Sequence, residues 1–247
     1  MERIRRRRRS IARRRCLLCG SPLARRGGAK RGRIVSELKF KVEGSAPERY
    51  AAVPTLNLAL RVEDDSGATV HAVALRCQIR IEPNRRRYSN EEEARLAEPF
   101  GDTPRWGDTL KPFLWTSVSQ MITEFDGSAV VQMPVQCTYD FEVAATEYFH
   151  SLDDGEIPLL LLFSGTVFTK GGAGLQVSQV PWHAEAAYRL PVSVWRAMMD
   201  PYFPNSGWLR LRRETLDQLM KLKARLAMPT WDDVLDVLMK EARAHSL

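Results

Sequence analysis

Two cysteines near the N-terminus have a spacing that can bind a metal ion. Cys16 and Cys19 are separated by two residues and followed by Gly20, which is the arrangement of one zinc knuckle. A structural zinc site needs four ligands, and no second pair of cysteines or histidines follows nearby. An isolated pair is half a site. The sequence therefore predicts no metal site, and it predicts no other cofactor.

The histidines and acidic residues do not form a catalytic pattern. The four histidines are His71, His150, His183 and His245, and none of them lies at metal-ligand spacing from another. Each is most simply a surface histidine, although a single one can serve as a general base. The acids Asp153, Asp154 and Glu156 surround Gly155, as in a polar turn; the alternative is a cation site.

The glycine-rich stretch also lacks the features of a catalytic loop. Gly171, Gly172 and Gly174 do not precede a helix and have no Lys-Ser or Lys-Thr of a phosphate loop, so they predict a hairpin turn. The sequence contains neither a Gly-x-Ser-x-Gly elbow nor a dinucleotide fingerprint. We assign no catalytic residue, and the sequence favours a protein that is not an enzyme.

Aromatic and charged residues instead gather in loops bounded by prolines. Trp, Tyr and Arg carry much of the binding energy of protein interfaces. Each tryptophan taken alone is better explained as pinning its loop onto the core. As a set they predict a protein-binding surface, centred on the 99–115 loop and on residues 202–208. Its members are Arg105, Trp106, Asp108, Trp115, Trp182, Tyr202, Phe203 and Trp208.

The net charge of +7 is the difference between two oppositely charged regions. The first 33 residues hold 14 basic residues and one acidic residue, whereas the rest holds 23 basic and 29 acidic residues. The basic stretch can neutralise phosphates and so bind nucleic acid without sequence preference. No aromatic side chains interleave it to stack on bases. An upstream start site in a GC-rich gene, with Val35 as the true initiator, would produce the same stretch.

The body of the chain has the patterning of a β-rich core domain. Residues 1–34 have few large apolar side chains, which predicts a disordered Arg-rich tail. From Leu38 onward apolar and polar residues alternate, which predicts a core domain over 35–190 built of antiparallel, sandwich-like sheets. The expected strands are 38–43, 56–63, 73–82, 113–122, 129–135, 137–143, 157–169 and 175–180. Pro134 places its strand at an edge or a bulge.

Helical periodicity replaces alternation after Pro191. A C-terminal segment over 191–247 is expected to form three helices packed on the core, with Thr230 and Asp233 as a capping box. Short helices are also expected at 91–96, capped by Ser89 or Asn90, and at 145–152. The predicted fold class is α+β. Residues 83–112 form a long polar excursion, which is either functional or loosely ordered.

Cysteine usage and hydropathy indicate a cytoplasmic protein. Cys77 and Cys137 lie far apart in the core domain and are expected to be buried thiols, with a disulfide between them as the alternative. The longest apolar run, Ile157–Phe163, is too short to span a bilayer, and no export signal is found.

Five stretches resemble an actinobacterial family of unknown function: Tyr50–Leu56, Ala74–Pro83, Arg105–Leu110, Asp154–Phe163 and Pro204–Leu209. The resemblance covers residues 36–240 and excludes the Arg-rich tail. Genes of that family tend to lie beside those of high-affinity uptake nickel–iron hydrogenases, which implies an accessory role in assembling, maturing or tethering the hydrogenase. The resemblance implies no catalytic residue. The chain is not the hydrogenase, because it lacks paired Cys-x-x-Cys motifs and has too few thiols for an iron–sulfur cluster.

We therefore expect a non-catalytic, cytoplasmic interaction protein with a protein partner, which the resemblance implies to be hydrogenase subunits. Two alternatives stay open. One is a small-molecule-binding protein or enzyme with a pocket between sheet and helices, and the other is nucleic-acid binding through the Arg-rich tail. The sequence leaves the oligomeric state undefined.

Overall fold

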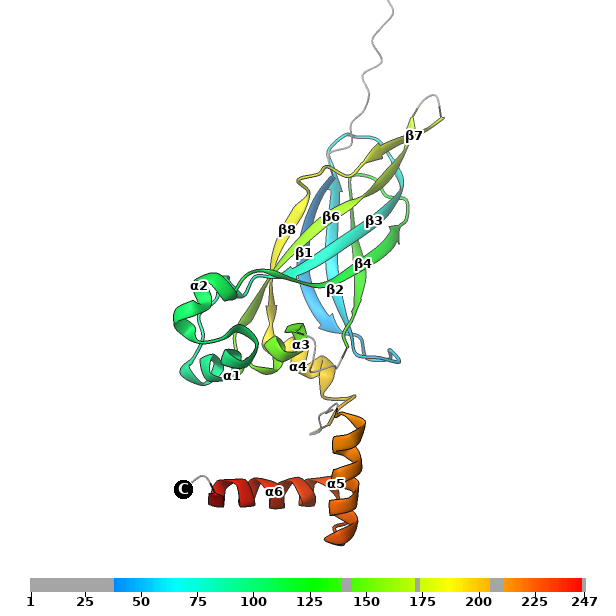
Figure 1. The fold of residues 1–247 in the computed structure, drawn as a ribbon. Helices are drawn as coiled ribbons and strands as arrows, with labels where there is room; N and C mark the ends of the chain where they lie inside the picture. The colour runs from blue at the N-terminus through cyan, green and yellow to red at the C-terminus, as the bar shows by residue number, and fades with distance from the viewer. Residues whose placement is uncertain (1–37, 139–143, 172–173, 205–210, 246–247) are drawn as a thin grey trace, which may run out of the picture. The chain divides into compact units, whose positions relative to one another are not determined.

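The computed structural model describes residues 38–138, 144–171, 174–204 and 211–245 (Figure 1). The chain divides into two units, Met1–Arg33 and Ile34–Leu247, and every described residue belongs to the second. The predicted disordered tail and the pair Cys16 and Cys19 lie outside the described residues. The described part contains two antiparallel β-sheets and six α-helices, so the expected α+β class is confirmed.

The first sheet has three strands in the order β1-β2-β5. They are β1 (Leu38–Pro47), β2 (Thr55–Asp64) and β5 (Ser128–Gln136), and both pairings are antiparallel. Every second side chain of β2 from Leu56 to Val62 is completely buried, namely those of Leu56, Leu58, Leu60 and Val62. Full burial of each such side chain stabilises the fold by about 1.5–3 kcal/mol. Because β5 is an edge strand, it tolerates Pro134, as the sequence predicts.

The second sheet is organised around its longest strand, β6 (Glu156–Gly171). One edge of β6 pairs with β3 (Val70–Ile81), which in turn pairs with β4 (Phe113–Ile122). The other edge pairs first with β8 (Glu185–Pro191) and then with β7 (Gly174–Gln179). All of these pairings are antiparallel. β6 therefore has three neighbours: β3 along one edge, and β8 and β7 along the other.

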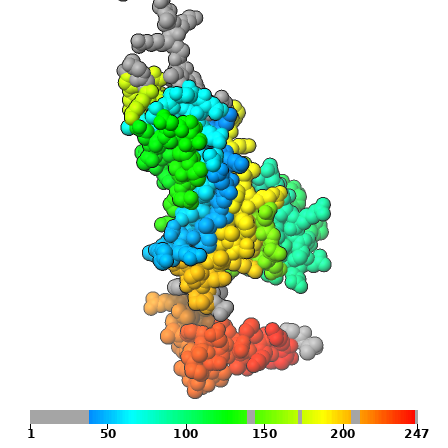
Figure 2. All heavy atoms as spheres, turned by 180° about the vertical axis from the view of Figure 1, so that it is seen from behind, coloured from blue at the N-terminus to red at the C-terminus, as the bar shows by residue number. Residues whose placement is uncertain are grey.

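The two sheets face each other and enclose the apolar core. The rings of Phe40 on β1 and Phe163 on β6 stack across the interior with centroids 4.2 Å apart. At one flank the Tyr188 hydroxyl donates to Ser45 Oγ at 2.9 Å, which joins β8 to β1. Figure 2 shows this flank from behind, with the blue strands β1 and β2 lying between the yellow segment of β8 and the green segment of β4 and β5. The predicted sandwich-like core is therefore present.

Four helices belong to the connections around the core. α4 (Val192–Met199) packs on β1, β2 and β8 and buries Trp195, Met198 and Met199. α1 (Asn90–Phe100) contacts α3 (Ala144–His150). Besides α1, the 83–112 excursion holds the short helix α2 (Trp106–Thr109) and the 3₁₀ turns η1 (Pro83–Arg85) and η2 (Thr103–Arg105). Of these four elements the sequence predicts only α1.

The last two helices contact each other. α5 (Arg213–Arg225) is followed by α6 (Trp231–His245). The predicted capping box at the start of α6 is confirmed, because the Asp233 N–H donates to Thr230 Oγ1 at 3.1 Å while the Thr230 N–H donates to Asp233 Oδ2 at 3.2 Å. That these helices pack on the core stays a prediction. None of the described helices is both long and apolar enough to cross a bilayer.

Two strand predictions need correction. A strand over 137–143 is wrong at its start, because β5 ends at Gln136 and the Cys137 N–H donates to the carbonyl of Pro54 at 2.8 Å outside any strand. Residues 139–143 lie outside the described part. Strand β8 was not expected from the sequence.

Candidate functional site

Two of the predicted surface tryptophans pack inward. Trp106 is half-buried, donates from Nε1 to the carbonyl of Gly101 at 2.8 Å, and lies edge-on against Tyr88 with ring centroids 5.4 Å apart. Trp115 lies edge-on against Phe149 at 5.0 Å. Both side chains fix their segments to the core, while the neighbouring predicted residues Arg105 and Asp108 are exposed.

The other predicted surface residues lie in different settings. The Tyr202 hydroxyl donates to the carbonyl of Ala51 at 2.6 Å, in the β1–β2 connection, and Phe203 packs against the core. Trp182 is 94% exposed in the β7–β8 connection. Trp208 lies outside the described residues. The contacts of the 99–115 loop and those of Tyr202 are thus to different parts of the fold, and a single joint surface stays a prediction.

An aromatic cluster anchors the 83–112 excursion. Tyr148 is fully buried, and its hydroxyl lies 2.9 Å from that of Tyr88, which donates to the carbonyl of Pro83 at 2.6 Å. Phe100 and Phe113 meet the Tyr148 ring edge-on at 6.2 and 6.1 Å. Burial raises the pKa of Tyr88 to about 12 and that of Tyr148 further, so neither phenol exchanges protons near neutral pH.

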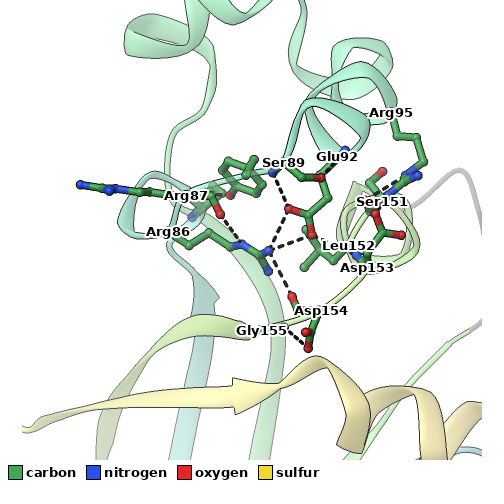
Figure 3. Close-up of polar contacts among 12 residues, drawn as sticks. Arg86, Arg87, Ser89, Glu92, Arg95, Ser151, Leu152, Asp153, Asp154 and Gly155 are labelled. Carbon is green, nitrogen blue, oxygen red and sulfur yellow. Dashed lines mark hydrogen bonds and ion pairs between the residues drawn. The ribbon is translucent and has the colours of Figure 1, made fainter.

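A buried ion pair joins the start of α1 to the connection that follows α3 (Figure 3). Arg86 and Glu92 have side chains only 9% and 4% exposed, and Arg86 Nη2 donates to Glu92 Oε1 at 2.8 Å. Ser89 is the N-cap of α1, one of the two caps that the sequence allows. Glu92 Oε2 accepts from the Ser89 N–H at 3.0 Å, which completes a capping box, and Oε1 accepts from the Asp153 N–H at 2.9 Å. One carboxylate thus organises two separate chain segments.

The acidic cluster of the sequence takes part in this junction. Asp153 pairs with Arg95, and Asp154 Oδ1 accepts from the Gly155 N–H at 2.5 Å in a turn where Gly155 has a φ of +79°. Arg86 Nη2 donates to the carbonyl of Asp154 at 3.2 Å. Within the described ranges no three or more His, Cys, Asp or Glu residues are grouped to hold a metal ion. The contacts of Asp153 and Asp154 are those of a polar turn.

An arginine-lined hollow lies beside this junction. Its volume is about 710 Å³, and it is lined by Asn84, Arg85, Arg86, Arg87, Gly155, Glu156 and Arg189. The β3–α1 connection supplies the first four residues, Gly155 precedes β6, and the paired strands β6 and β8 supply Glu156 and Arg189. The run Asn84-Arg85-Arg86-Arg87 was visible in the sequence but was not singled out, because its partners are about 70 to 100 residues away.

The histidines occupy four separate settings. His71 Nδ1 lies 2.9 Å from a Glu124 oxygen, His183 meets the Trp182 ring edge-on, and His245 Nδ1 lies 2.8 Å from the carbonyl of Glu241. His150 lines a second hollow of about 300 Å³. Burial, with a smaller contribution from Arg196, lowers the pKa of His150 and favours the neutral ring.

The outer edge of β7 is open. β7 ends the strand path β4-β3-β6-β7 and pairs with β6 alone among the described strands. Its run Leu175-Gln176-Val177-Ser178-Gln179 carries no charge, and Leu175 and Val177 are 56% and 53% exposed. Sheet edges in soluble proteins are usually protected by charge, proline or a covering segment. β7 has neither charge nor proline, and among the described strands none pairs with its outer edge.

The body cysteines are confirmed as buried free thiols, and the alternative disulfide is not formed. Burial raises the pKa of both Cys77 and Cys137 to about 12. In a variant with Cys16 and Cys19 replaced by serine, we expect Ellman's reagent at pH 8 to modify the two thiols at least about 100-fold more slowly in folded than in urea-unfolded protein, because the thiolate is the reactive form. A rapid phase in folded protein would contradict this.

Comparison with known proteins identifies the family of the chain. No curated protein matches it. One solved structure that is similar in part is a β-glucosidase from Kluyveromyces marxianus, with 6% identity and a TM-score of 0.24 over 62% of this chain. The match spans 15% of the β-glucosidase, and a likeness of this size carries no argument about fold or activity. The chain belongs to the family of unknown function DUF6084, whose model matches residues 35–247.

Proposed function

We propose that the protein is a non-catalytic interaction protein that binds a protein partner along the open edge of β7, and that this partner is a subunit of a nickel–iron hydrogenase. The observation that carries the binding role is the uncharged, unpaired β7 edge. The choice of partner is supported by the resemblance of residues 36–240 to a family encoded beside hydrogenases. An accessory role in assembly, maturation or tethering fits a protein to which we assign no catalytic residue.

Strand addition supplies the affinity in this proposal. An extended segment of the partner that pairs with β7 would satisfy its free backbone N–H and C=O groups, as in other proteins that bind peptides at a sheet edge. The exposed side chains of Leu175 and Val177 would then contact alternate residues of the added strand. Trp182 lies shortly after the end of β7, beyond Val180 and Pro181, and is 94% exposed. A tryptophan in such a position is a typical hot spot of a protein interface.

Two substitutions test the binding edge. We expect Trp182→Ala to weaken capture of hydrogenase subunits by about 2 kcal/mol, a factor of about 30, because it removes a hot-spot side chain. Val177→Lys should weaken it by at least about tenfold, because a charge on an edge strand opposes strand addition. The measurement is affinity capture from a host that encodes both proteins, with the chain at its natural level.

A matched control is Leu114→Lys, which places the same charge on β4, at the opposite edge of the sheet, on a side chain of similar exposure (56%). This variant should capture the partner as the parent does. If the parent recovers no hydrogenase subunit, the assignment of the partner is wrong. If Val177→Lys and Leu114→Lys behave alike, the assignment of the β7 edge is wrong.

Small-molecule binding is a second candidate function. It is favoured by the arginine-lined hollow, since ligand sites in proteins have volumes of about 300–1,000 Å³. The expected pocket between sheet and helices differs from this hollow, which is lined by the β3–α1 connection and the ends of β6 and β8. No described residue there has the arrangement of a nucleophile with its base.

A further inference from the structure

We propose that the arginine-lined hollow binds a small polyanion, a molecule with at least two phosphate or carboxylate groups. Four of the seven lining residues are arginines, and one, Glu156, is acidic. Guanidinium groups bind both kinds of oxyanion through paired, charge-assisted hydrogen bonds. The site is separate from the β7 edge, because β7 and β8 pair with different stretches of β6 and only β8 contributes to the hollow.

The arginines of the hollow are unequally neutralised. Arg85 is paired with Glu82 at 3.0 Å. Arg189 approaches Glu156 only to 3.9 Å, which is beyond hydrogen-bond distance, and both side chains are more than half exposed. In the part of the chain that the structure describes, the guanidinium of Arg87 has no carboxylate within 4 Å. Arg87 and Arg189 are therefore the two cations best placed to bind an anion from solution.

Arg86 supplies a rigid wall to the hollow. Its Nε donates to the carbonyl of Arg87 at 3.2 Å, and its Nη2 donates to Glu92 and to the carbonyl of Asp154 (Figure 3). These bonds fix the main chain that carries Arg87. The third nitrogen, Nη1, is buried and has no hydrogen-bond partner among the described residues. A buried donor without an acceptor is unfavourable, and negative charge bound in a hollow that Arg86 lines would partly offset this cost.

Glu156 provides a test in the opposite direction, because its negative charge should lower the affinity of the hollow for an anion. Its carboxylate faces Arg189 and would repel a bound anion. Removing this charge should therefore strengthen binding, whereas removing Arg87 or Arg189 should weaken it. A purely structural role for these exposed side chains predicts no such reversal, because exposed pairs contribute little to stability.

The test is titration of the full chain with pyrophosphate and, separately, with citrate, which distinguishes a phosphorylated from a carboxylated ligand. Calorimetry gives the affinity, and the amide resonance of Gly155 reports binding in the hollow. We expect Arg87→Gln and Arg189→Gln each to weaken the better probe about tenfold, and Glu156→Gln to strengthen it about fivefold. Arg76→Gln, an exposed arginine of β3 that does not line the hollow, should leave the affinity unchanged.

The 13 arginines of residues 1–33 are the same in every variant, and the Gly155 resonance distinguishes binding in the hollow from binding to those arginines. Binding of either probe with the expected signs supports the site. The proposal is overturned if the Gly155 resonance is unmoved by millimolar concentrations of both probes, if Arg87→Gln and Arg189→Gln bind as Arg76→Gln does, or if Glu156→Gln weakens binding.

Discussion

Replacing Glu92 with alanine is expected to lower the free energy of unfolding by about 3–5 kcal/mol, because it leaves the buried Arg86 without its counter-charge. The same change removes the acceptor of the Ser89 and Asp153 amides, one at the start of α1 and one after α3. The measurement is urea unfolding monitored by circular dichroism. Glu91→Ala, an exposed acid in the same helical turn, should change stability by no more than about 0.5 kcal/mol.

A double variant separates the two parts of this effect. Arg86→Met combined with Glu92→Leu removes both charges, and replacing a buried pair with apolar groups is often close to neutral. The two amides still lack their acceptor, so we expect partial recovery relative to Glu92→Ala. If Glu92→Ala costs no more than Glu91→Ala, the carboxylate is not the anchor of this junction.

Alanine at Gly165 is expected to destabilise the protein by at least about 3 kcal/mol. Gly165 has a φ of +149°, and an added Cβ would lie 2.1 Å from the carbonyl oxygen of Ala74. That oxygen belongs to β3, which pairs with β6 at this point, so the clash is with backbone that cannot turn aside. Either β6 and β3 separate locally or the strand bends. The measurement is again the urea midpoint.

Gly44 provides the matched control for this substitution. It also lies in a strand, β1, but has no atom within 4 Å of an added Cβ. Gly44→Ala should change stability by no more than about 1 kcal/mol. Equal stability of Gly44→Ala and Gly165→Ala would show that β6 and β3 are less closely apposed at Gly165 than described.

Local patterns predicted most of the individual elements. Strict alternation in β2 and β3, the helix cap at Ser89 and the capping box at Thr230 are signals contained within about ten residues. Strand β8 was not predicted, because one of its buried positions is Ala186, whose small side chain weakens the apolar–polar alternation. The order of the strands in the sheets could not be predicted from local patterns, because strands that pair, such as β3 and β6, are far apart in sequence.

The same limit applies to the site. Aromatic content drew attention to the 99–115 loop and to Trp182, but the exposure of a ring depends on what it packs against. The inward packing of Trp106 and the outward position of Trp182 were therefore indistinguishable in sequence. The hollow needs Arg87 and Arg189 on neighbouring segments, and the pairing of β6 with both β3 and β8 brings these segments together.

The division of one β6 edge between β8 and β7 leaves the two neighbours independent. Insertions or deletions in the β6–β7 hairpin beyond Thr169 would change the length of the β7 ribbon without disturbing the β3 register, which ends at Thr169, or the β8 register, which pairs residues 156–162 with 185–191. The length and sequence of this ribbon are thus set separately from the pairings that hold the rest of the sheet together.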